Sequence, residues 1–302
     1  MALKNIKNKI VATKKTGQVT KAMEAVSAVK MRKSQERALA SRSYAHAAAR
    51  MLEHLSVTGD RALLPYIESR PEGRILLVLV TSDKGLAGSV NSAVLKQAEQ
   101  YIGMDACDSI CIGRKAVEFA RRQLKGKVIA EYVGVADDFT LADVEDIATK
   151  ISDAFASGVY KEVHVNYQTF VSTFEQRPTS QQLLPLKPSV LRDIVAGIRP
   201  KEGMFAGDES ELMRGSDYTY EPDAETVLKS LMPQLINIMI FHMLIESKAC
   251  EHSARMIAMK NATDKTKEMI KSLTLKFNKE RQAVITAEVS EISGGMEAMK
   301  EV

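Results

Sequence analysis

The sequence predicts an α/β protein in which two long terminal helices pair as an antiparallel coiled coil. Apolar and small residues recur at steps of three and four residues through residues 1–57 and again through residues 223–302. This 3.5-residue period keeps one seam facing a partner helix, as a left-handed coiled coil requires. Between the two segments, short apolar runs alternate with helical patterns, which is typical of a layered α/β domain.

The first helix is predicted over residues 1–57 and ends before Thr58 and Gly59. It would be roughly 80 Å long at about 1.5 Å per residue. Its seam is Leu3, Ile6, Ile10, Thr13, Gly17 and Thr20, and Ala22, Val26 and Val29 continue the stripe one position round. The helix holds twelve Lys or Arg and three Glu, so it carries most of the positive field of a chain whose net charge is +4.

The middle of the chain, residues 58–222, predicts a Rossmann-like α/β domain with a mainly parallel sheet. The expected strands are Ile75–Val80, Ser109–Ile112, Val128–Val133 and Glu162–Gln168, and Thr169–Leu186 has room for one more. The expected helices run from the loop after the first strand to Ile102, and over Arg114–Leu124 and Leu141–Phe155. Residues 187–221, rich in Pro, Gly and acidic side chains, are predicted to be loop-like.

The second long helix is predicted from residue 223, after Glu221 and Pro222, to Ser293, where two glycines follow. The apolar run Leu231–Ile245 is shorter than the roughly 20 apolar residues of a membrane span, so we expect a buried helix, kinked at Pro233. The seam of the second helix is Ile245, Ala249, His252, Met256, Met259, Thr263, Thr266, Ile270, Leu273, Phe277, Glu280, Val284, Ala287 and Glu291.

The pairing register follows if both helices leave the middle domain at the same level. Position 57 then lies beside position 223, which puts Met23 near Ile257 and Met1 near Lys279. Residues 280–302 must project alone as a tip. The tip carries enough apolar surface to sit in a hydrophobic bearing. Its apolar residues are Val284, Ile285, Val289, Ile292 and Met296, with Met299 beyond.

The glycine loop after the first strand raises the alternative of a nucleotide-binding enzyme. Gly85 and Gly88 match neither the dinucleotide fingerprint nor the phosphate loop that ends in GKS or GKT. The favoured interpretation is a tight strand-to-helix turn on a surface that meets another protein. No catalytic constellation stands out, and no cofactor is expected.

Two further alternatives are nucleic-acid binding and metal binding. The basic first helix lacks interleaved aromatic residues before Tyr44, so a solvated face or one that meets acidic protein loops is favoured. Cys107 and Cys111 flank a predicted strand without a nearby His pair, which argues against a zinc site. Three sparse cysteines fit a reducing compartment.

Several runs of sequence resemble the gamma-subunit family of rotary F-type ATP synthases, in order and over essentially the whole chain. They are MALKNIKNKI, Thr20–Met23, Ser82–Gly88, Asp217–Asp223, Ala254–Met259, Asn261–Asp264, Phe277–Ala283 and Ile285–Thr286. The resemblance implies a central-stalk rotor shaft that transmits rotation from a proton-driven c-ring to the catalytic hexamer of alpha and beta subunits. It also implies an epsilon subunit as a partner and ATP chemistry on beta, so that this chain is not itself catalytic.

The resemblance also implies partner contacts. Arg281 and Gln282 match the family's contact to the catch loop of the beta subunit, with Thr286 nearby. Met23 and Arg255 match positions where the two helices interlock and meet the lower edge of the hexamer. The loop that faces the acidic lever segment of beta corresponds to Lys84, Gly85, Leu86, Ala87 and Gly88.

The chain opens without a transit peptide and lacks the cysteine insert of chloroplast homologues, so a bacterial enzyme is expected. The implied location is peripheral, on the cytoplasmic face of the cell membrane, with membrane association only through the complex. The competing classes are a static coiled-coil adaptor and a nucleic-acid-binding protein.

Overall fold

The computed structural model describes residues 2–40, 66, 69–186 and 224–300. The chain divides into two compact units. We call Met1–Val26 with Met256–Val302 the coil, and Ser27–Arg255 the head. The domain boundaries expected at residues 57 and 222 lie outside the described residues and stay predictions, as do the helix beyond residue 40 and the loop-like segment 187–221.

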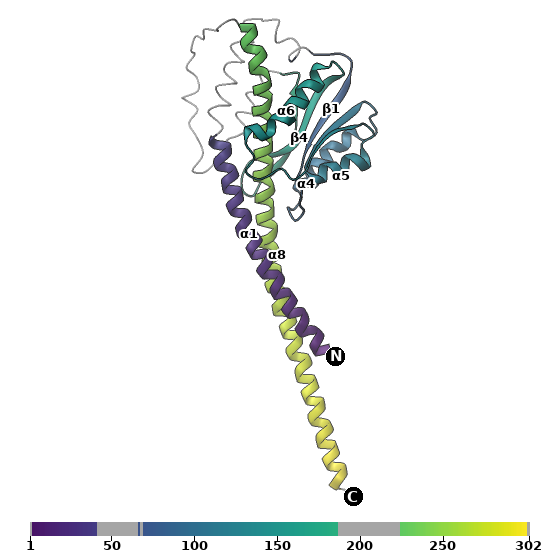
Figure 1. The fold of residues 1–302 in the computed structure, drawn as a ribbon. Coiled ribbons are helices and arrows are strands. Elements are labelled where there is room, and N and C mark those ends of the chain that lie inside the picture. Colours follow the sequence, from purple (N-terminus) through teal and green to yellow (C-terminus); the bar gives the residue numbers. More distant parts are fainter. Residues whose placement is uncertain (1, 41–65, 67–68, 187–223, 301–302) are drawn as a thin grey trace. The chain divides into compact units, whose positions relative to one another are not determined.

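The two terminal helices are α1 (Ala2–Ala40) and α8 (Ala224–Lys300) (Figure 1). The expected end of α8 at Ser293 is wrong, because the helix continues through Gly294 and Gly295. Each glycine weakens a helix by about 1 kcal/mol relative to alanine, but extending an existing helix needs no new nucleus. Pro233 lies inside α8.

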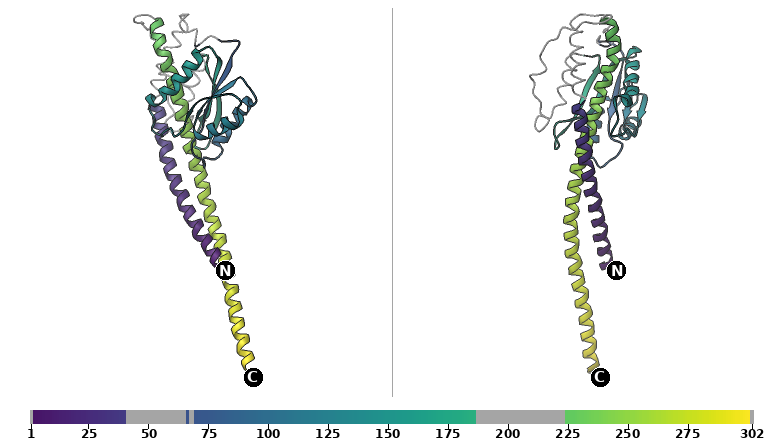
Figure 2. Two further views of the ribbon diagram at one scale, coloured as in Figure 1. Left: turned by 45° about the vertical axis from the view of Figure 1, so that its right-hand side comes forward. Right: turned by 60° about the vertical axis from the view of Figure 1, so that its left-hand side comes forward.

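In the coil, α1 and α8 run antiparallel and side by side, as predicted (Figures 1 and 2). The hydroxyl oxygens of Thr20 and Thr263 lie 2.7 Å apart in a buried contact. The expected register, with Met23 beside Ile257, would put Thr20 beside Lys260. The observed pairing is therefore displaced by three residues along α8.

The predicted seam of α8 is confirmed in the coil. Met259 and Thr263 are buried, Thr266, Ile270, Leu273, Phe277 and Glu280 are half-buried, and most residues between them are exposed. The predicted continuation of the α1 stripe through Ala22, Val26 and Val29 is wrong, since all three are exposed. The covered positions after Thr20 are instead half-buried Met23, buried Ser27, half-buried Met31 and buried Ser34, which keep the steps of three and four residues.

The C-terminal part of α8 continues past the start of α1 without α1 beside it, as predicted (Figure 2). Every residue from Arg281 to Met296 is exposed. The exposed fractions of Val284, Ile285, Val289, Ile292 and Met296 are 40%, 47%, 60%, 66% and 60%. The tip thus presents apolar side chains that the described chain leaves uncovered.

The head contains a five-stranded sheet in the order β3-β2-β1-β4-β5. Its strands are β1 (Arg74–Val80), β2 (Cys107–Ile112), β3 (Val128–Tyr132), β4 (Tyr160–Phe170) and β5 (Gln176–Leu184). The pairs β3-β2, β2-β1 and β1-β4 are parallel, and β5 runs antiparallel to β4. The mainly parallel sheet is confirmed, with the further strand falling inside Thr169–Leu186.

Helices cover both faces of the sheet. They are α4 (Val90–Ala98), α5 (Arg114–Gln123) and α6 (Leu141–Ala156), and the 3-10 turn η2 (Glu99–Tyr101) continues α4. Leu77 and Leu79 of β1 pack with residues of α4 and α5, whereas Leu76 and Val78 pack with α6 and α8. This alternation follows from the pleat of the strand, which points successive side chains to opposite faces.

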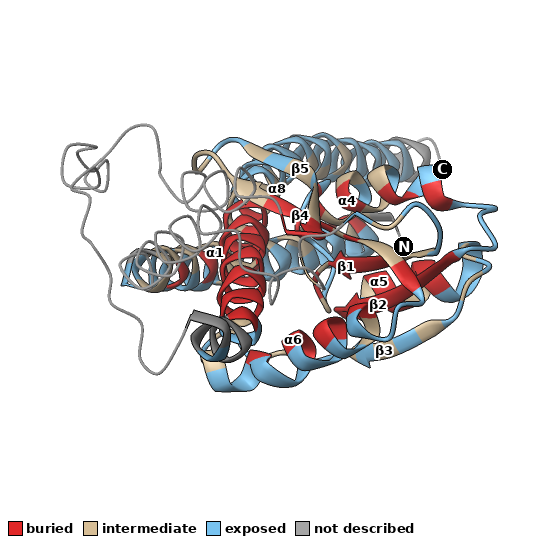
Figure 3. Cartoon of the chain, turned by 90° about the horizontal axis from the view of Figure 1, so that it is seen from above, coloured by how far each residue is buried: buried red, intermediate tan, exposed pale blue. Residues whose placement is uncertain are grey.

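Residues of α8 also contribute to the hydrophobic core of the head. Residues from Met232 to Ala254 are mostly buried, and Met239, Leu244 and Ile245 join the same cluster as the sheet (Figure 3). The apolar run Leu231–Ile245 is therefore a buried helix segment, as predicted. Among the described residues, no helix has an apolar stretch long enough to cross a membrane.

Candidate functional site

The loop after β1 lies at the carboxyl edge of the parallel sheet, where open α/β sheets usually bind ligands. Here the chain uses its own side chains to fill that edge. Asp83 Oδ1 accepts a hydrogen bond from the backbone N–H of Arg114 at the start of α5 (3.0 Å), and Asp83 Oδ2 accepts one from that of Gly134 (3.0 Å). A carboxylate thus occupies the helix N-terminus that a phosphate would otherwise use.

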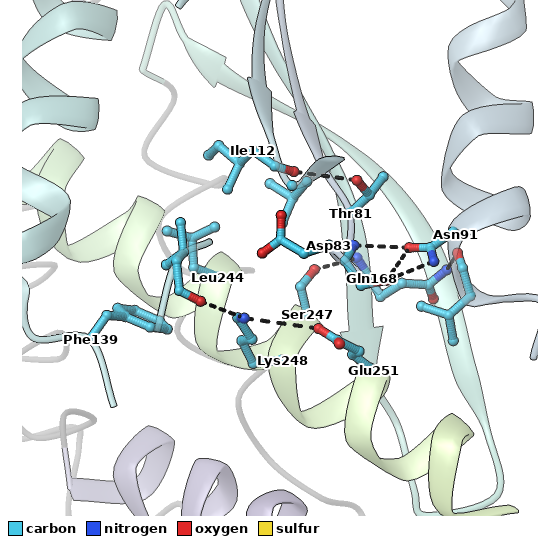
Figure 4. A pocket seen from close by; sticks show the side chains of 15 residues that line it. Thr81, Asp83, Asn91, Ile112, Phe139, Gln168, Leu244, Ser247, Lys248 and Glu251 are labelled. Carbon is cyan, nitrogen blue, oxygen red and sulfur yellow. Dashed lines mark hydrogen bonds and ion pairs between the residues drawn. The ribbon is translucent and has the colours of Figure 1, made fainter. Parts of the chain in front are cut away.

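The pocket beside this loop is small (Figure 4). Its walls come from the ends of β1, β2 and β4 and from α8, including Leu244, Ser247, Lys248 and Glu251. It encloses about 20 Å³, room for about one water molecule, whereas small-molecule sites span about 300–1,000 Å³. Ser247 Oγ accepts the backbone N–H of Gln168 at 3.0 Å, so α8 is hydrogen-bonded into the place of a ligand.

The glycine loop holds one apolar side chain out to solvent. Leu86 has a φ of 62° and is 65% exposed, whereas Ala87 beside it is buried. A left-handed backbone is costly for a non-glycine residue and is found mainly where the surroundings enforce it. Ser82 Oγ donates to Lys84 O at 2.7 Å, and Ser82 N donates to Asn91 Oδ1 at 2.9 Å, so the base of the loop is braced.

Arg255 of α8 supports the same loop from below. Its Nη2 lies 3.4 Å from both Lys84 O and Gly85 O, and 2.7 Å from Glu251 Oε1. The Arg255 and Glu251 side chains are each only 10% exposed. The resemblance placed Arg255 in the helix pairing. The spacing of four residues between Glu251 and Arg255 signals their ion pair, but no local pattern signals the contact of Arg255 with the loop.

The remaining predicted site residues lie on α1 and α8. Met23 is half-buried in the coil. Arg281, Gln282 and Thr286 are all exposed on the tip. Gln282 and Thr286 are one turn apart and share a face of the helix, while Arg281 shares a face with Ile285.

The three cysteines are free and buried. Burial raises the pKa of Cys107 and of Cys111 to about 11, and raises that of Cys250 well above its usual value. The thiols therefore stay protonated near neutral pH and are poor nucleophiles and metal ligands. Within the part of the chain that the structure describes, no cluster of His, Cys, Asp and Glu side chains suits a metal ion.

Comparison with solved structures supports the architecture. The fold is similar to a chain of the Euglena gracilis mitochondrial ATP synthase (OSCP/F1/c-ring), with a TM-score of 0.64, 15% identity and coverage of 99% of this chain and 94% of that one. It is also similar to a chain of the Tetrahymena thermophila mitochondrial ATP synthase central stalk and c-ring, with a TM-score of 0.57, 24% identity and coverage of 81% and 99%. The chain therefore shares its fold with chains of these two ATP synthases.

Sequence comparison places the chain within that class. Residues 2–299 match the family model described as ATP synthase. The chain is 39% identical over 309 residues to the ATP synthase gamma chain of Roseiflexus castenholzii, covering 99% of both chains. It is 35% identical over 300 residues to that of Heliobacterium modesticaldum, covering 98% of this chain and 99% of the relative. The chain belongs to the ATP synthase gamma chain family.

Proposed function

We propose that this gamma chain is the central-stalk rotor shaft of a bacterial F-type ATP synthase. The shaft transmits rotation from a proton-driven c-ring to a catalytic hexamer of alpha and beta subunits for ATP synthesis, or in reverse during hydrolysis. The observation that carries the proposal is the single-helix tip, which extends beyond the end of α1 with its apolar side chains exposed. Such a tip needs a surrounding partner, and a hexamer with a central opening provides one.

The tip has the form of a bearing surface. Successive residues of a helix turn by about 100°, so Val284, Ile285, Val289, Ile292 and Met296 fall within an arc of about 140°. The apolar side chains of the tip therefore gather on one side, where Arg281 and Glu288 also lie, and the opposite side carries small and polar residues. A rotating shaft of this kind presents different chemistry to each of three surrounding beta subunits in turn, which is the asymmetry that a rotary mechanism uses.

The coil supplies the stiffness between tip and head. Paired helices with interlocked side chains resist twisting and bending better than a single helix. Thr20 and Thr263 form a buried contact in a seam that otherwise consists largely of apolar and small residues. This contact favours one register, as polar seam residues do in coiled coils. A fixed register keeps the two helices from sliding when torque is applied.

The partner contacts complete the proposal. Arg281, Gln282 and Thr286 contact the beta catch loop, Met23 and Arg255 meet the lower edge of the hexamer, and residues 84–88 face the beta lever. The exposed side chain of Leu86 and the bracing of its loop support the last of these. The head binds epsilon and the c-ring, and through them the chain is held peripherally at the cytoplasmic face of the cell membrane.

The chain is a non-catalytic subunit in this proposal. The carboxyl edge of its sheet is occupied by Asp83 and by α8, which supports assigning ATP chemistry to beta. We expect no saturable ATP hydrolysis by the purified chain. Hydrolysis that is lost on Asp83→Ala would contradict this assignment.

Direct observation of rotation tests the proposed function. A cysteine in place of exposed Gln123 at the end of α5 gives an attachment point for a bead, because the native cysteines are buried. In an immobilised complex that hydrolyses ATP, the bead should turn in one direction. A complex that hydrolyses ATP while the bead stays still would favour the static-adaptor alternative.

The tip contact has its own test in the assembled complex. Arg281→Ala with Gln282→Ala should lower the rate of ATP synthesis while subunit content stays normal, because the Arg281 guanidinium presents five donors suited to a carboxylate partner. The control is Asn278→Ala with Lys279→Ala, two exposed residues about one turn earlier, which should keep the wild-type rate. Equal rates for both variants would remove these two residues from the contact.

A further inference from the structure

A carboxylate between β3 and α6 contacts both terminal helices within the head. Asp137 lies in the loop that follows β3, and its side chain is 33% exposed. One oxygen, Oδ2, lies 2.7 Å from Lys30 Nζ of α1. The other, Oδ1, lies 3.2 Å from His252 Nε2 and 3.4 Å from Lys248 Nζ, both on α8.

The backbone of the same loop reinforces both sides. Arg37 of α1 donates from Nη1 to Asp137 O at 2.7 Å and from Nη2 to Phe139 O, and its guanidinium lies 5.3 Å from the centroid of the Phe139 ring. Lys248 of α8 donates to Val135 O at 2.9 Å. The loop is therefore attached to each helix by a charged side chain that bonds its carbonyl groups.

The charges around Asp137 favour its ionised form. The His252 contact lowers the pKa of Asp137 most, and Lys30 and Lys248 lower it further, against the opposing effect of burial. Glu251, the other carboxylate on the facing part of α8, is 4.0 Å from Lys248 Nζ and is paired with Arg255. The carboxylate therefore stays charged at neutral pH, and its contribution to stability is lost only as the pH falls below the ordinary value of about 3.8.

We propose that Asp137 is a positioning residue for torque transfer, a tie that fixes α1 and α8 to each other and to the head through the two oxygens of one carboxylate. The inference rests on the proposed rotor function. A slide of either helix by one residue, about 1.5 Å, would stretch one set of these contacts beyond hydrogen-bonding distance. Torque that enters the head therefore reaches both helices together.

The test uses the complete ATP synthase in membrane vesicles with Asp137→Asn. The matched control is Asp138→Asn, an exposed neighbour in the same loop that removes the same charge. Subunit content and ATP hydrolysis should stay near wild type for both variants. ATP-driven proton pumping per ATP hydrolysed should fall for Asp137→Asn alone, because the helices slip against the head under load.

Hydrogen exchange of residues 27–40 in the same complex reports the tie directly. Loss of one hydrogen bond to a charged group shifts an opening equilibrium by about tenfold or more, so protection of α1 amides should fall by that factor for Asp137→Asn. Lys30→Met, which removes only the α1 side of the tie, should lower protection similarly. The double variant should be no worse than Asp137→Asn, because the two changes remove one interaction.

The outcomes separate the tie from the rotor function. A purely structural role would lower subunit content and would reduce hydrolysis and pumping in parallel, which would overturn the proposal. Unchanged pumping and exchange in Asp137→Asn would also overturn it, while bead rotation in the wild-type complex would leave the rotor function standing. If Asp137→Asn fails to assemble, loss of pumping at normal hydrolysis in Lys30→Met supports the tie, and normal pumping refutes it.

Discussion

The tight contact between α1 and α8 at Gly17 predicts that the effect of Gly17→Ala on the stability of the coil changes sign with the residue at position 266. A methyl group at Gly17 would lie 2.7 Å from Thr266 Oγ1, well inside van der Waals contact. Thr266 Oγ1 is held in place by its hydrogen bond to Thr263 O at 2.7 Å. Rotating it away loses that bond, at a cost of about 1 kcal/mol, and overpacking adds about 1–3 kcal/mol if the helices must separate.

The opposing gain is the helix propensity of alanine, about 1 kcal/mol relative to glycine. We therefore expect Gly17→Ala to destabilise the coil by about 1 kcal/mol in the wild-type background. With Thr266→Ala the obstructing hydroxyl is gone, and the same Gly17→Ala should stabilise the coil by about 1 kcal/mol. The two backgrounds thus differ by about 2 kcal/mol, which is an interaction energy between residues in contact.

Native-state hydrogen exchange of amides around Gly17 measures this difference, because it reports local opening of the coil separately from unfolding of the head. The four chains needed are the wild type, each single variant and the double variant. A stabilising Gly17→Ala in the wild-type background, or equal effects in the two backgrounds, would show that the helices do not approach as closely as described at this point.

Two further predictions concern the coil and the sheet. Cysteines at Thr20 and Thr263, whose hydroxyl oxygens lie 2.7 Å apart, should oxidise readily to a disulfide, whereas Thr20→Cys with Ser290→Cys should not, as gel mobility without reductant will show. Gly126→Ala should lower the thermal unfolding midpoint of the head strongly, because the new Cβ would lie 1.5 Å from Cys107 O; a midpoint within 2–3 °C of wild type, a change of about 1 kcal/mol or less, would contradict the packing there.

Most of the predictions that the structure confirms came from local sequence patterns. The seam through Ile270 and Phe277 is confirmed, because steps of three and four residues define one face of a helix wherever the partner lies. The predicted stripe through Val26 and Val29 is wrong. It followed the most apolar residues, whereas the steps of three and four residues continue through Ser27. Small polar residues can occupy a tightly packed seam, and composition alone does not reveal this.

Long-range contacts were beyond prediction. Nothing in the local sequence distinguishes Asp137 from Asp138, and only the packing of α1 and α8 around the loop gives the first of them its partners. The same holds for Arg255, whose contact with Lys84 O joins residues far apart in the chain. The three-residue difference in register is a further example, because the repeat of three and four residues defines a face of each helix but not which residues of α1 lie beside which residues of α8.

The burial of the first part of α8 in the head has a consequence for evolution and for engineering. The sheet face that carries Leu76 and Val78 is completed by Met239 and Ile245, so the head is assembled from pieces that are not contiguous in sequence. Residues 69–186, expressed alone, would leave that face open to water and to aggregation. A chimera that exchanges heads between two relatives must therefore carry residues 224–255 with it, and an inherited change in either piece invites a compensating change in the other.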